Sequence, residues 1–181
     1  MRCSLVALTV LLLVTGCATE PQPQLVTDPG VSLAGYKELE VAPAVNNTGQ
    51  TFDFDFVSVF TEDLKSALQA KGYHVSNVNG STPDALIVQC TFVTYSPGNA
   101  TERMVGAGTT EATVKTTVVD KKSGKAVGDM VTTKKIGGGF PLLCPACAVI
   151  VAASTIGEYK RILQGVADDV ASAIDNKIKG S

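Results

Sequence analysis

The chain has 181 residues, a formal net charge of −2, 45% hydrophobic residues, five cysteines, one histidine and no tryptophan. A chain of this length and composition forms one domain with a substantial core, and its near-neutral charge argues against the basic surface that nucleic-acid binding requires. A single histidine makes most hydrolytic triads and histidine-rich metal sites hard to build. We therefore expect one folded domain with no nucleic-acid partner and no cofactor.

The first sixteen residues have the pattern of an export signal. Arg2 supplies a positive charge and residues 5–14 form an almost unbroken apolar run, which is too short to cross a hydrocarbon core of about 30 Å as a helix. The run ends in Val14-Thr15-Gly16-Cys17, which resembles the lipobox of bacterial lipoproteins. This resemblance implies cleavage before Cys17 and a diacylglyceryl thioether on its sulfur. The alternative is an ordinary cleaved signal followed by a cysteine by chance.

Acyl chains on Cys17 would hold the mature protein on a membrane, because two or three such chains bind lipid almost irreversibly. Ala18 follows the anchor, where an aspartate favours inner-membrane retention in the sorting systems of diderm bacteria. By that analogy we expect a periplasm-facing protein of the outer membrane. The proline-rich residues after Ala18 are typical of an extended tether. We divide the chain into a signal peptide (1–16), a lipidated N-terminus with a flexible tether (17–34) and a single domain (35–181).

Hydrophobic periodicity predicts the elements of that domain. Leu39 and Val41 alternate with Glu38 and Glu40, as in a short half-buried strand. In chain order we expect a strand at 38–41, a helix at 53–70 with Gly72 as its C-cap, strands at 73–78 and 85–95, a hairpin of strands 111–119 and 126–136, and a helix from Thr155 to the C-terminus.

The fold class follows from the faces of these elements. The strand at 85–95 has Ile87 and Val93 on the face opposite its main apolar face, which favours a strand covered on both sides. Thr155 and Glu158 have capping-box spacing at the start of the last helix, which carries an apolar stripe. Two helices with one apolar face each can cover one side of a sheet. We predict an α+β two-layer sandwich, with a mainly antiparallel sheet of about five strands and two helices packed on one face.

Several turn and glycine motifs carry a resemblance to a known family. They are Tyr95-Ser-Pro-Gly-Asn, Val105-Gly-Ala-Gly, and the strand that ends at Asp120 with Ser123-Gly124 in the following turn. Together with the capped terminal helix, they resemble an uncharacterised family of bacterial lipoproteins known only as a domain of unknown function. The resemblance covers about Leu33 to Ile178 and implies a fold more than a chemistry. The element order is more distantly similar to lipoproteins that activate cell-wall synthases.

Three cysteines remain once Cys17 carries lipid and Cys3 leaves with the signal. Cys144 and Cys147 form a CxxC pair, for which we expect a structural disulfide in the oxidising envelope. A catalytic thiol–disulfide role is one alternative, although the pair does not follow the first strand of a βαβ unit, and unpaired or partner-linked thiols are another. Cys90 lies on the inward face of its predicted strand and is expected to pack as a small hydrophobe.

Two polar features are weaker candidates for a site. His74 has no nucleophile and carboxylate at a recognised spacing, so we expect a surface histidine rather than a general base. Asp53, Asp55, Glu62 and Asp63 gather near the start of the first helix, where helix capping explains negative charge. Neither feature predicts a catalytic residue.

The most unusual segment is 136–157, twenty-two residues without a charge. Three consecutive glycines and two prolines argue against a continuous membrane-spanning helix there. The segment is either buried on the sheet or exposed as an apolar patch for a protein partner or the lipid surface. We expect a non-enzymatic, lipid-anchored envelope protein that binds another envelope protein, and an envelope redox protein that uses Cys144 and Cys147 is the alternative.

Overall fold

The computed structural model describes residues 22–80, 82–96, 109–137 and 148–180, with side chains for all of them except 137 and 148–158. Seven strands and two helices make up this part of the chain. They are β1 (Val26–Thr27), β2 (Glu38–Val41), β3 (Val45–Asn46), α1 (Phe56–Ala70), β4 (His74–Asn77), β5 (Leu86–Ser96), β6 (Thr109–Asp120), β7 (Lys125–Gly137) and α3 (Ala148–Lys179).

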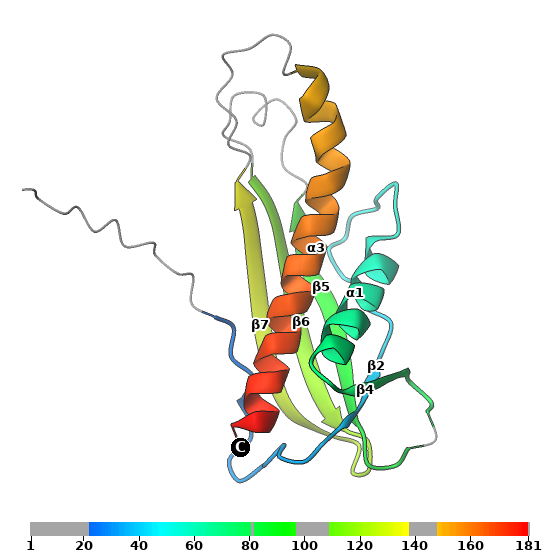
Figure 1. Ribbon diagram of the computed structural model, residues 1–181, viewed down its shortest axis with the longest axis vertical. Coiled ribbons are helices and arrows are strands. Elements are labelled where there is room, and N and C mark those ends of the chain that lie inside the picture. The colour runs from blue at the N-terminus through cyan, green and yellow to red at the C-terminus, as the bar shows by residue number, and fades with distance from the viewer. Residues whose placement is uncertain (1–21, 81, 97–108, 138–147, 181) are drawn as a thin grey trace, which may run out of the picture.

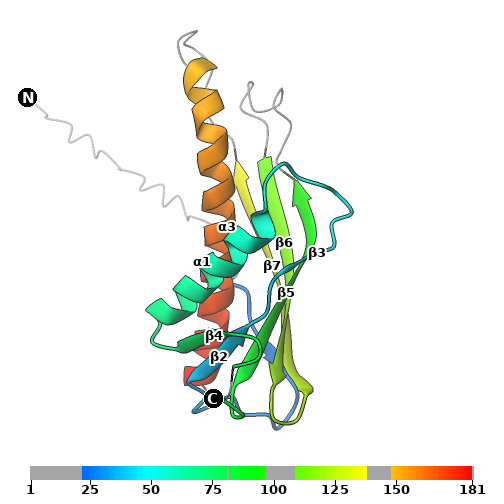
Figure 2. The same cartoon turned by 90° about the vertical axis from the view of Figure 1, so that its right-hand side faces the viewer.

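The strands form one mixed sheet in the order β1-β7-β6-β5-β2-β4, and β3 also pairs with β5. The long strands β5, β6 and β7 are antiparallel neighbours, whereas β2 runs parallel to both β4 and β5. Both helices lie on the same side of the sheet (Figures 1 and 2). The predicted α+β sandwich with two helices on one face is thus confirmed. Two strands beyond the expected five, β1 and β3, have only two residues each and so no periodicity to detect.

Helix α1 ends at Ala70 as its sequence predicts, but it begins at Phe56 rather than at the expected residue 53. Asp55 is the N-cap, because its Oδ1 accepts a hydrogen bond from the backbone N–H of Ser58 at 3.1 Å. Gly72 follows the C-cap with a φ of +92°, a left-handed conformation that glycine adopts without strain. The face turned toward the sheet buries Phe56, Phe60, Thr61, Leu64 and Leu68.

Strand β5 supplies the centre of the core from one face only. Leu86, Val88 and Phe92 are fully buried there, whereas Val93 on the opposite face is 46% exposed. The expectation that this strand is covered on both sides is therefore wrong. The two helices pack against each other on one face of the sheet and leave the other face open.

Helix α3 begins at Ala148 rather than at the predicted Thr155. The residues between 148 and 155 include no proline or glycine and continue the helix without interruption. The predicted apolar stripe is buried from Ile162 to Ile178. The first turns of α3 extend past the ends of β6 and β7 (Figure 1). Among the described residues, no helix combines the length and the apolar character needed to cross a bilayer.

Part of the segment expected to be a tether packs on the domain. Leu25 and Leu33 are buried in the core, and β1 pairs antiparallel with Gly128 and Asp129 of β7. Gly128 is required at this crossing, because a Cβ there would lie 2.9 Å from the carbonyl oxygen of Val26. The packed structure therefore begins on the N-terminal side of residue 35.

Candidate functional site

The predicted anchor and the CxxC pair lie outside the described residues. Cys17, Cys144 and Cys147 are all in this category, so their lipidation and oxidation stay predictions. Among the described residues, no three His, Cys, Asp or Glu side chains gather in a way that could hold a metal ion.

Cys90 is the one cysteine that the structure describes, and it is a buried free thiol, as predicted. Its Sγ lies 3.4 Å from Oγ1 of Thr116 on the neighbouring strand β6. Burial raises the pKa of the Cys90 thiol to about 12, since a thiolate would lose its hydration there. A thiol in this state is a poor nucleophile, so Cys90 is a packing residue.

The other polar candidates are structural. His74 is an exposed residue of the edge strand β4, and its Nδ1 lies 3.7 Å from Oε1 of Glu38. Asp55 caps α1, as the clustering of acidic residues near that helix suggested. Hydrogen bonds from the side chain and the backbone N–H of Ser58 lower the pKa of the Asp55 carboxyl.

Glu40 of β2 and Lys121 form a buried ion pair that the sequence pattern did not predict. Alternation placed Glu40 on the open face of its strand, but its side chain is only 1% exposed. Lys121, which follows β6, places its Nζ 2.5 Å from Oε1 of Glu40 and donates a second hydrogen bond to the carbonyl oxygen of Gly80. Oε2 of Glu40 is buried and has no partner among the described atoms. The pair joins the loop after β4 to the end of β6.

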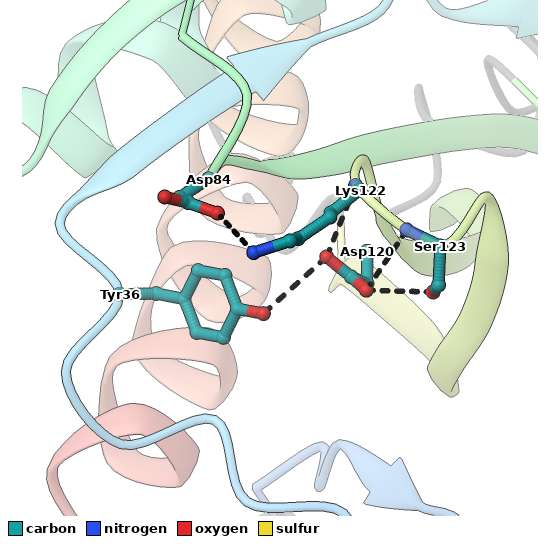
Figure 3. Close-up of polar contacts among 5 residues, drawn as sticks. All are labelled: Tyr36, Asp84, Asp120, Lys122 and Ser123. Carbon is teal, nitrogen blue, oxygen red and sulfur yellow. Dashed lines mark hydrogen bonds and ion pairs between the residues drawn. The ribbon is translucent and has the colours of Figure 1, made fainter.

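A polar cluster holds the turn between β6 and β7 (Figure 3). Oδ2 of Asp120 accepts hydrogen bonds from the hydroxyl and the backbone N–H of Ser123, at 2.6 and 3.2 Å. Tyr36 donates its hydroxyl to Oδ1 of the same carboxylate at 3.3 Å, and Lys122 pairs with Asp84 at the same distance. The hydrogen bond from the Ser123 side chain is the main reason why the pKa of Asp120 is lowered. Asp120 and Ser123 therefore stabilise the turn between β6 and β7.

The outer edge of β7 is the most accessible feature for binding another chain. The described part of β1 pairs only with Gly128 and Asp129, so no described strand pairs with β7 from Met130 to Gly137. Val131 on this edge is 59% exposed. Gln22 and Pro23 pass beside the edge and help to line a groove of about 320 Å³. An unpaired edge presents backbone N–H and C=O groups that can pair with an incoming strand.

Comparison with known proteins places the chain in a family. Residues 36–139, more than half of the chain, match the family described as Domain of unknown function (DUF4410). The chain belongs to this family. The match confirms the expected domain of unknown function, over a shorter stretch than the predicted Leu33–Ile178. No curated protein sequence matches the chain.

Solved structures share the fold at low sequence identity. The PelC dodecamer from Paraburkholderia phytofirmans is 12% identical, with a TM-score of 0.55, over 83% of this chain and 97% of that chain. The hypothetical protein CT253 from Chlamydia trachomatis is 9% identical, with a TM-score of 0.54, over 81% and 99%. The lipoprotein GNA1162 from Neisseria meningitidis is 12% identical, with a TM-score of 0.44, over 68% and 98%. The structural neighbours thus include PelC and bacterial lipoproteins, and the likeness to PelC and CT253 shows the fold.

Proposed function

We propose that this protein is a non-enzymatic lipoprotein of the bacterial outer membrane, anchored by acyl chains on Cys17 and facing the periplasm. Its α+β domain binds a second copy of the same chain through the open edge of β7 and so builds an assembly on the membrane. The DUF4410 domain is the part that carries the sheet and its edge. No cofactor takes part.

The anchor is supported by the N-terminal sequence. A charged start, a short apolar run and Val14-Thr15-Gly16-Cys17 follow one another as in bacterial lipoproteins. Only four residues, 18–21, separate Cys17 from Gln22 in the sequence.

The open edge of β7 is the observation that carries the assembly. No described strand pairs with the outer side of this strand over eight residues, Met130–Gly137, although Gln22 and Pro23 pass beside part of it. At the opposite side of the sheet, β4 is the terminal strand. A sheet with open edges on both sides can add copies head to tail, and such contacts close into rings when the rotation allows it. PelC, which shares the fold, forms a dodecamer, and this offers a precedent.

A redox role for Cys144 and Cys147 is the competing proposal. Thiol titration of the full chain separates the two, because a structural disulfide resists alkylation until a reductant opens it. Two thiols that exchange rapidly with a mixed disulfide would instead support redox chemistry. Cys90 serves as an internal reference, because its buried thiol should react only after unfolding.

The anchor is tested with Cys17→Ala in the original bacterial host. The variant should accumulate as unacylated precursor and lose acyl labelling, whereas Cys90→Ala should be labelled like the native protein. Acyl labelling that persists in Cys17→Ala would refute the anchor.

The assembly is tested by crosslinking and native mass spectrometry of the acylated protein. Val131→Lys places a charge beside the open edge and should abolish crosslinks between copies. Val93→Lys is the matched control, since it places the same charge on the open face of the inner strand β5 and should leave the assembly intact. A native protein that stays monomeric at membrane density, or equal loss in both variants, would contradict an assembly through β7.

A further inference from the structure

The first three turns of α3 form a helical tip at one end of the molecule. Residues 148–157 of this helix carry no charged side chain, and Glu158 is the first charge in the helix. The tip extends past the ends of β6 and β7 in both views (Figures 1 and 2). The segment that precedes it in the sequence, 138–147, is also uncharged. The tip itself is thus free of charge, and the described charges nearest to the ends of β6 and β7 are Glu111 and Lys135, which form an ion pair with each other.

The opposite end is strongly charged. The turn between β6 and β7 and the C-terminus of α3 both lie there (Figure 1). Lys122 and Asp84 form an exposed ion pair beside that turn, and Lys179 pairs with Asp175 in the last turn of α3. Because charged groups are costly to remove from water, the uncharged tip of α3 is better suited to an apolar environment than the opposite end of the molecule.

The lengths of two segments relate the tip to the acylated cysteine. Gln22 lines a groove together with Lys134, and a Cβ on Gly165 of α3 would lie 3.2 Å from Cε of the same lysine. Gln22, Lys134 and Gly165 therefore lie at about the same height along the axis of α3. Ala148 precedes Gly165 by seventeen residues, which corresponds to about 25 Å of helix. The five residues from Gln22 to Cys17 reach at most about 17 Å. The tip thus extends roughly 8 Å or more beyond the farthest level that the backbone of Cys17 can reach.

We propose that the α3 tip, residues 148–157, inserts into the lipid leaflet that holds the acyl chains of Cys17. The inference rests on the proposed anchor and adds a second membrane contact built from the domain itself. When Cys17 lies at the membrane surface and the end that carries the tip faces the lipid, the tip reaches below the headgroups. Ten helical residues are about 15 Å long, so the tip matches one leaflet of a core about 30 Å thick. Helical backbone suits this depth, because most of its N–H and C=O groups are satisfied within the helix.

This double contact would fix the orientation of the domain. An acyl anchor alone leaves the domain free to tumble. An inserted helix instead holds α3 with its long axis upright relative to the membrane surface. The charged turn of Figure 3 would then point into the periplasm, away from the lipid. The open edge of β7 would stand upright on the membrane, in the same orientation in every copy.

Tryptophan fluorescence tests the insertion, because the native chain has no tryptophan. The acylated full chain is reconstituted in vesicles of phosphatidylethanolamine and phosphatidylglycerol whose acyl chains carry bromine, a quencher located in the hydrocarbon. Ile150→Trp reports on the tip, and Ala152→Trp is a second reporter if the first variant fails to fold. Ala126→Trp is the matched control, because Ala126 is exposed near the charged turn. Mass spectrometry and flotation of the same samples record acylation and membrane binding.

The proposal expects the tip reporter to lose most of its emission in brominated vesicles and the control to lose none. A tip reporter that is quenched by acrylamide in water but not by brominated lipid would overturn it, with acylation and flotation still intact. A reporter shielded from both quenchers would also overturn it and would indicate contact with another protein. A chain that carries no lipid and does not float would refute the anchor itself, and with it the insertion.

Discussion

The buried pair of Glu40 and Lys121 gives the sharpest prediction for stability. Lys121→Met removes the cation that neutralises Glu40, whose side chain is 1% exposed. It also removes the donor to the carbonyl oxygen of Gly80. Oε2 of Glu40 has no partner among the described atoms, so the carboxylate would be left without compensation.

The magnitude follows from the burial of the two partners. Breaking a fully buried ion pair by removing one partner costs about 3–5 kcal/mol. The Lys121 side chain is 23% exposed, so water reaches part of the site and we expect a loss of about 2–3 kcal/mol. Replacing both partners by methionine removes the buried charge as well and should cost less than about 1 kcal/mol. Glu40→Met alone leaves Lys121 partly hydrated and should cost about 1 kcal/mol, so the coupling energy between the two positions should be about 2–3 kcal/mol.

Urea unfolding followed by far-ultraviolet circular dichroism measures these free energies in a double-mutant cycle. Lys122→Met is the matched control, because the neighbouring Lys122 forms only an exposed pair with Asp84 and should cost less than about 1 kcal/mol. The reasoning is refuted if Lys121→Met is no less stable than the double variant, or if both lysine variants lose the same free energy.

Three further predictions concern single residues. The pKa of the Cys90 thiol is about 12 in the folded state and near 8.5 in the unfolded state. The free energy of unfolding should therefore fall by up to about 1.4 kcal/mol per pH unit as the pH rises between these values. Cys90→Ala should lack this contribution in urea titrations from pH 8 to 11. Gly124 has a φ of +67° and free space around its Cα, so Gly124→Ala should cost about 1 kcal/mol in urea unfolding and Gly124→Asn less, whereas equal costs would exclude backbone strain. Phe56 stacks on Tyr95 at 4.9 Å and meets Phe92 edge-on at 4.8 Å; Phe56→Ala should cost about 3–5 kcal/mol, and a loss below about 1 kcal/mol would show that the ring contributes little.

Local patterns determined the elements of this protein. The spacing of Phe60, Leu64 and Leu68 predicts α1, and the alternation in β6 and β7 predicts the hairpin. These signals suffice because helix and strand periodicity are properties of neighbouring residues. The same holds for the C-cap at Gly72, where a left-handed conformation follows from one residue.

Contacts between distant segments were beyond those patterns. Glu40 and Lys121 are 81 residues apart. A glutamate on the polar side of a strand does not by itself indicate that it will be buried or that a distant lysine will pair with it. Which face of β5 is covered also depended on where α3 packs, because both faces of this strand are partly apolar.

For function, the sequence alone determined the candidate anchor at Cys17 and the uncharged segment 136–157, because a signal and a lack of charge are written in consecutive residues. Only the tertiary structure decided that part of this segment continues α3 as a projecting tip, and that β7 keeps an open edge. Those outcomes depend on how far α3 extends beyond the sheet and on which strands pair. Both are decided by packing between segments that are distant in the chain.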